Sequence, residues 1–196
     1  MSAKATLDKL THSYTASDGN RVSLCVSDVL RLSGIVQPYP EGAQRFVEHA
    51  RELGETVHEW CDYMDEGATD VESLADSEIL PYVLAYQRFR EEHRPEWDVI
   101  EGSYATEEFA GTVDRMGAIG KESVILDIKT PRKAEAHWGI QLSAYQILTG
   151  RSECALYALL LSSDATYRLI PYQPEPDVFL AALKVAQWKL ANGKVK

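Results

Sequence analysis

Three side chains between residues 111 and 130 have the types and spacing that chemistry on phosphodiesters requires. Asp114 ends one short apolar stretch, and Asp127 and Lys129 lie two residues apart in the next. Carboxylate oxygens suit Mg²⁺ or Mn²⁺, and such an ion can polarise a phosphoryl oxygen and lower the pKa of a bound water. A nearby lysine can stabilise the charge that builds on the phosphate. The three residues therefore favour a metal-dependent nuclease.

Two strands must position these side chains. Residues 124–130 are β-branched and apolar, without Gly or Pro, and predict a largely buried strand. Because side chains alternate across a strand, Ile125, Asp127 and Lys129 should share one face. A lysine and an aspartate on that face are costly to bury unless they are paired or bind a ligand.

A second predicted strand, residues 109–119, precedes the first, and residues 117–122 (GAIGKE) supply a turn between them. The two strands then form an antiparallel hairpin that brings Asp114 beside Asp127. An isolated Asp-x-Lys sequence is most often only an ion pair at a strand end. The nuclease hypothesis therefore depends on the residues that accompany it.

A predicted helix over residues 134–148 supplies two of these residues. Its apolar side chains recur at helical spacing, and Gly150 is a natural stop. Gln141 and Tyr145 lie four residues apart and share one face, where they could brace the site or contact a DNA backbone. A helical tyrosine alone more often indicates core packing.

A second predicted helix, from about residue 41 to residue 64, carries Gly54 and His58 one turn apart. Glycine costs a helix roughly 1 kcal/mol, which suggests that the surface bearing Gly54 and His58 is tightly packed. A lone helical histidine is more often structural. Of the five histidines, His58 is the one that we select as a ligand.

These residues, in this order, resemble the RecB-like branch of the PD-(D/E)XK nuclease superfamily. The matching segments span about half of the chain: residues 54–58 (G-x-x-x-H), Glu101, residues 111–114 (G-x-x-D), residues 127–129 (D-x-K) and residues 141–145 (Q-x-x-x-Y). The opening residues 12–23 look like a short hairpin, and they resemble small phage-encoded exonucleases that feed recombination.

The resemblance implies a role for each motif residue. His58, Asp114 and Asp127 would bind Mg²⁺ or Mn²⁺, with the Ile128 backbone carbonyl as a further ligand, and Lys129 would be catalytic. Gln141 and Tyr145 would belong to the motif of the following helix, with a role in positioning DNA. Glu101 is only a possible ligand, because Glu107 and Glu108 lie nearby in the sequence and could supply a carboxylate instead. Arg132 and Lys133 cluster beside the site and could contact DNA, or they could form a solvated turn.

The element order predicts an α/β or α+β fold in one domain, residues 1–196. An N-terminal hairpin and helices (1–95) would precede the catalytic sheet core (96–196), a central mixed sheet flanked by helices, as in the restriction-endonuclease-like core of the superfamily. The chain has 196 residues and 45% hydrophobic content, enough for one core. No stretch is long enough to span a membrane, and the first ten residues lack a signal-peptide core, so we expect no membrane association.

Cysteine usage predicts a reducing compartment, the cytoplasm of a bacterium or of a phage-infected host. Cys25, Cys61 and Cys154 are few and widely separated, which argues against a disulfide framework. Some RecB-like nucleases carry an iron–sulfur cluster on four cysteines, so we expect none here.

The formal net charge of −10 is the main contrary observation, because phosphates are bound by cations. Acidic residues concentrate between residues 62 and 78, and a bound divalent cation would neutralise the carboxylates of the site. A recombination partner protein or a homo-oligomer could also supply positive surface. Two hypotheses follow: a metal-dependent DNase, an exonuclease rather than a sequence-specific endonuclease, or a catalytically weak nuclease-fold module that binds DNA ends or a recombination partner.

Overall fold

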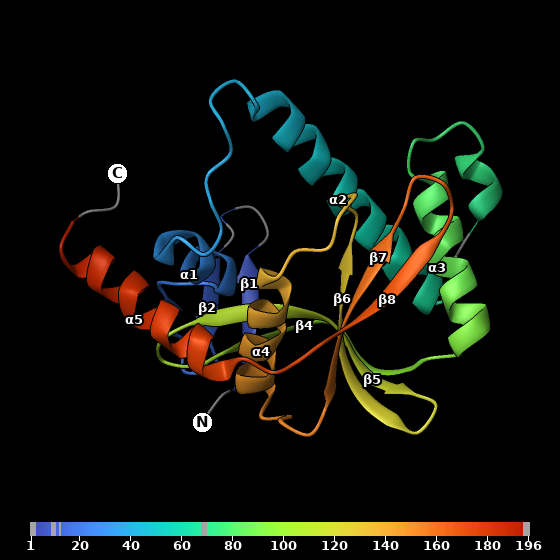
Figure 1. The fold of residues 1–196 in the computed structure, drawn as a ribbon. Coiled ribbons are helices and arrows are strands. Elements are labelled where there is room, and N and C mark those ends of the chain that lie inside the picture. Colours follow the sequence, from blue (N-terminus) through green and yellow to red (C-terminus); the bar gives the residue numbers. More distant parts are fainter. Residues whose placement is uncertain (1–2, 9–10, 12, 68–69, 194–196) are drawn as a thin grey trace.

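The computed structural model describes residues 3–8, 11, 13–67 and 70–193. These residues form a mixed eight-stranded sheet, in the order β3-β2-β1-β4-β5-β6-β7-β8, with helices on both of its faces (Figure 1). The strands are β1 (Ala3–Asp8), β2 (Ser13–Ala16), β3 (Arg21–Val22), β4 (Glu96–Ala105), β5 (Ala110–Ile119), β6 (Glu122–Lys129), β7 (Ala155–Leu161) and β8 (Tyr167–Tyr172). The helices are α1 (Val26–Ser33), α2 (Gln44–Asp65), the 3₁₀ helix η1 (Val71–Leu74), α3 (Leu80–His93), α4 (His137–Thr149) and α5 (Pro176–Ala191).

The predicted α/β class, with a central mixed sheet between helices, is confirmed. The predicted hairpin is β5–β6, and its ladder runs from Arg115 opposite Leu126 to Ile119 opposite Glu122. Gly120 adopts a positive φ of 62° in the connecting turn, a conformation that glycine adopts without strain. The next strand, β7, pairs with β6 in parallel, so α4 is the crossover helix between them.

Two hydrophobic cores cover the two faces of the sheet. Ile125 packs with α1, α4 and α5 on one face. Leu126 and Ile128 pack with α2 and α3 on the other face. The alternation predicted for this strand is therefore confirmed, and it directs Asp127 and Lys129 toward α4.

The N-terminal region adds an element that the sequence did not indicate. The predicted hairpin is present as β2 and β3, and His12, the first residue of the segment predicted to form it, lies outside the described residues. The unexpected strand β1 joins this hairpin to the main sheet, because it pairs with both β2 and β4. Its polar and apolar residues alternate over only six positions. Within the described ranges, no helix has the length and apolar character that crossing a membrane requires.

The two motif glycines have different structural reasons. A Cβ on Gly111 would lie 2.9 Å from Val26 Cγ2 and 3.0 Å from Leu148 Cδ1, so this glycine lets α1 and α4 approach β5. A Cβ on Gly54 would meet only Thr130 Oγ1 at 3.5 Å, an ordinary van der Waals distance. The tight packing predicted around Gly54 is therefore wrong, because this part of α2 has room for a methyl group.

We predict opposite effects of alanine at these two glycines. Gly111→Ala should destabilise the protein by about 1–3 kcal/mol, because the new methyl overfills a close contact. Gly54→Ala should stabilise it by up to about 1 kcal/mol, because alanine is the better helix former. Urea unfolding of both variants beside the wild type measures the difference, and equal effects at the two sites would contradict the assignment.

Candidate metal centre and active site

The site begins where the β5–β6 ladder stops. Beyond the Arg115–Leu126 pair, Asp114 and the segment from Asp127 onward are no longer paired, so the peptide groups of β6 on that side need other partners. The Ile128 N–H donates to Asp114 Oδ2 at 2.7 Å. Nε2 of His58, on α2, lies 3.0 Å from the Ile128 carbonyl oxygen and donates to it. The backbone of a single residue, Ile128, therefore joins two of the predicted metal ligands.

The neighbouring strand β4 is irregular at the same level. Its pairing with β5 skips Glu101 and Asp114, between the Ile100–Arg115 and Gly102–Val113 pairs, and Glu101 has a φ of 50°. A non-glycine residue in this region costs of order 1–3 kcal/mol, and such residues concentrate at functional sites. The Glu101 side chain reaches the others, with Oε1 3.7 Å from His58 Nδ1.

Glu101, His58 and Asp114 together form a candidate metal centre. One ligand atom from each lies within 4.8 Å of the other two. Glu101 Oε1 is buried without a hydrogen bond, and His58 Nδ1 lies 3.6 Å from Asp114 Oδ2. Two carboxylates, a carbonyl and one imidazole form an oxygen-rich donor set that fits a hard divalent cation. The sequence had offered Glu101 only as a possible ligand, and the structure brings it into this group.

Asp127 lies outside that group and belongs to a second cluster around Lys129. Its Oδ2 forms an ion pair with Lys129 Nζ. Gln141 on α4 joins the two residues, since its Oε1 accepts from Lys129 at 3.1 Å and its Nε2 donates to Asp127 Oδ1 at 3.2 Å. Gln141 also donates to the Tyr145 hydroxyl at 2.8 Å. The helix motif therefore holds the lysine and the aspartate at fixed positions.

The residues around this second cluster are either buried in the core or exposed to solvent. The Lys129 ammonium lies 5.7 Å from the centre of the Trp138 ring, and this tryptophan is buried against Ala158 and Leu160. Trp138 is therefore a core residue. Tyr145 is also buried. Arg132 and Lys133 are exposed in the loop between β6 and α4.

The electrostatics of the site follow from burying several charges together. Burial lowers the pKa of His58, but the charges of Asp114, Glu101 and Asp127 outweigh burial and raise that pKa to about 9. Burial raises the pKa of Asp127 to about 6, against the opposing effect of Lys129. Burial also raises the pKa of Asp114. The protonated imidazole therefore supplies positive charge at a place where carboxylates converge.

Sequence reasoning missed Arg115, the residue after Asp114. Its side chain is completely buried and forms ion pairs of 2.7 Å with Asp62 and with Asp65, both on α2. The same guanidinium donates to the Asp114 carbonyl at 2.8 Å and lies 3.7 Å from Glu101 Oε1. A signal was present, because an arginine inside an apolar strand requires partners as much as Lys129 does.

Comparisons with known proteins give little beyond this geometry. No family model matches the chain, and no curated protein sequence matches it. Among solved structures, SSO0001 is 17% identical, with 86% of this chain and 75% of that chain covered and a TM-score of 0.41. An alkaline exonuclease from Laribacter hongkongensis (LHK-Exo) is 15% identical, with 86% of each chain covered and a TM-score of 0.45. Likenesses this weak carry no argument about activity.

We predict that the stability contributed by His58 depends on pH. Its pKa in the folded protein, about 9, lies above its ordinary value of 6.5. The contribution is therefore fully present below pH 6.5 and is lost as the pH rises through about 9. Without added metal and with EDTA, the Tm difference between wild type and His58→Gln should be largest near pH 6.5 and should shrink by pH 9.5.

The exposed His49, which pairs with Glu78 at the surface, provides the control. His49→Gln should leave Tm nearly unchanged across the same range, because exposed ion pairs contribute little. A difference between wild type and His58→Gln that does not vary with pH would show that His58 carries no charge in the folded protein.

Proposed function

We propose that this chain is a divalent-metal-dependent deoxyribonuclease of the RecB-like PD-(D/E)XK type, and that it acts as an exonuclease. The observation that carries the proposal is convergence. Four side chains from four different elements gather around the backbone of Ile128 and the end of β6: His58, Glu101, Asp114 and Lys129. Buried titratable groups that meet at one place are candidates for a functional site, because burial and neighbouring charges shift their pKa values.

The metal would be held by His58, Asp114 and the Ile128 carbonyl, with Glu101 and Asp127 as additional carboxylate ligands. Mg²⁺ or Mn²⁺ bound there would polarise the phosphoryl oxygen, activate water and stabilise the leaving oxygen. To accept a cation, His58 must release its imidazole proton. Before a cation binds, the same proton stabilises the neighbouring carboxylates, as the raised pKa of His58 indicates.

Lys129 would stabilise the charge that builds on the scissile phosphate or orient the attacking water. Its ammonium is held from two sides, by Asp127 and by Gln141, so little movement remains to be restricted when the substrate binds. Gln141 positions Lys129 and Asp127. Tyr145 is buried behind Gln141, so we assign it a bracing role and not a direct contact with DNA.

DNA would approach over the loop between β6 and α4, where Arg132 and Lys133 are exposed next to Lys129. Both residues can neutralise phosphates, and such contacts make binding sensitive to salt. The net charge of −10 also favours the second candidate, a catalytically weak module that binds DNA ends or works with a recombination partner.

The test is release of nucleotides from end-labelled linear duplex and single-stranded DNA in Mg²⁺, Mn²⁺ or EDTA. We expect metal-dependent release, with losses of about 10²–10³-fold in both Asp127→Asn and Lys129→Met, because each removes a group that stabilises the transition state. Mn²⁺ binding measured by calorimetry should separate the two variants. It should weaken in Asp127→Asn and persist in Lys129→Met.

Matched controls are Asp98→Asn and Lys121→Met, which make the same changes of charge at exposed positions on β4 and in the β5–β6 turn. Both should cleave as the wild type does. Cleavage at the wild-type rate by Lys129→Met would refute the catalytic assignment. If wild type binds Mn²⁺ and DNA but degrades neither substrate, the binding module becomes the better description.

A further inference from the structure

We propose that Arg115 is a positioning residue for the metal centre: held by Asp62 and Asp65, it fixes α2 and the Asp114 backbone so that the metal ligands converge. The inference rests on the proposed function and deepens it, because it names residues that bind neither metal nor DNA but set how well the centre binds its cation.

Helix α2 presents one face to the sheet. His58, Asp62 and Asp65 lie at positions i, i+4 and i+7, so they form one row along the helix. His58 reaches the Ile128 carbonyl, and the two aspartates, one and two turns later, reach the guanidinium of Arg115. Arg115 therefore fixes the rotation and the axial position of the helix that carries the imidazole.

On the sheet, the same guanidinium lies against the Asp114 backbone and the Glu101 side chain. One nitrogen, Nη1, donates to the Asp114 carbonyl at 2.8 Å and lies 3.7 Å from Glu101 Oε1. The hydrogen-bonding ladder of β5 with β6 has already ended here, so the side chain of Arg115 takes over as partner of the Asp114 backbone. A single buried cation thus contacts the residues of two ligands and the helix of the third.

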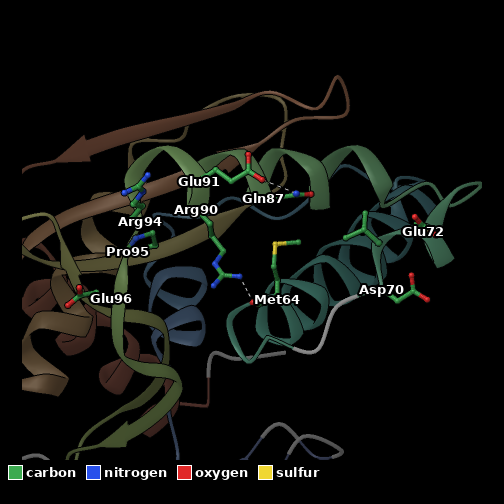
Figure 2. A pocket seen from close by; sticks show the side chains of 10 residues that line it. Met64, Asp70, Glu72, Gln87, Arg90, Glu91, Arg94, Pro95 and Glu96 are labelled. Carbon is green, nitrogen blue, oxygen red and sulfur yellow. Dashed lines mark hydrogen bonds between the residues drawn. The ribbon is translucent and has the colours of Figure 1, made fainter.

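At the end of the network farther from the candidate centre, two side chains of α3 hold the Asp65 carboxylate. Tyr86 donates to Asp65 Oδ2 at 2.6 Å, and Arg90 Nε lies 3.0 Å from Asp65 Oδ1. Figure 2 shows Arg90 directed toward the Met64 carbonyl, at the inner side of a pocket of about 900 Å³ between the ends of α2 and α3. The network therefore runs from this pocket to the candidate centre and ties α2, α3 and β5 together.

Groups that orient metal ligands typically change metal affinity 10–100-fold when they are removed. Asp62 is the suitable position for a test, because its side chain is 23% exposed and Asn retains its shape and a hydrogen-bonding oxygen. In Asp62→Asn we expect the Kd for Mn²⁺ to rise at least about tenfold. Cleavage at saturating Mn²⁺ should return to within about threefold of wild type, because no group that acts on DNA is altered.

The matched control is Glu59→Gln on the same helix, one residue after His58. Its carboxylate is exposed and accepts only from Tyr63 among the hydrogen bonds described here, so the variant makes the same charge change without touching Arg115. Its Mn²⁺ affinity should match that of wild type. A second variant, Arg115→Lys, keeps the charge but loses the planar fork, and should bind Mn²⁺ more weakly than Asp62→Asn.

Calorimetric Mn²⁺ titration and thermal unfolding of all four proteins decide the matter. Weaker Mn²⁺ binding in Asp62→Asn, with the control unchanged, supports the positioning role. A lower Tm with unchanged Mn²⁺ affinity in Asp62→Asn would show a structural role alone and overturn it, as would equal weakening in Glu59→Gln. If wild type binds no Mn²⁺, the proposed function itself fails, and the inference fails with it.

Discussion

The whole site depends on the backbone N–H and carbonyl of one residue, Ile128, which β5 does not pair. Where β5 and β6 separate, the N–H and the carbonyl of Ile128 lose the strand that would have bonded them, and a buried peptide group cannot remain without partners. Asp114 takes the N–H and His58 takes the carbonyl. These two contacts bring a carboxylate from the sheet and an imidazole from a helix to the same place. The end of the pairing between the two strands therefore brings together the residues that we propose as ligands.

The buried charges are arranged so that each acidic group has a cation beside it. Asp127 has Lys129, Asp114 and Glu101 have His58, and Asp62 and Asp65 share Arg115. Removing one partner from such an arrangement costs about 3–5 kcal/mol, because the other charge stays buried. The acidic overall composition thus gives a misleading impression of this region. Two of the acids that the sequence places in an acidic helical segment neutralise an arginine inside the protein.

The sequence predicted the elements that local patterns determine. The β5–β6 hairpin, the alternation of β6 and the helix with Gln141 follow from turn residues and apolar periodicity. It did not predict β1, whose short alternating run resembles a loop and acquires its role only from pairing with β4. It also could not rank Glu101, because no local pattern predicts its positive φ or the break in the β4–β5 pairing at this residue. Arg115 was missed because its partners lie 50 and 53 residues earlier, where no local pattern connects them.

The contacts of the site fall into two classes of sequence separation, and this has a kinetic consequence. The hydrogen bonds between Asp114 and Ile128 and between Gln141 and its partners Lys129 and Asp127 span 12 to 14 residues, whereas the bond from His58 to Ile128 spans 70. Short loops lose less chain entropy on closure, so contacts of this kind form early in folding. We therefore expect the β5–β6–α4 unit to assemble first and α2 to dock onto it afterwards. Amide hydrogen exchange during refolding would show this as later protection of α2 than of the β5–β6–α4 unit, so the half of the site that carries His58 would mature after the half that carries Lys129.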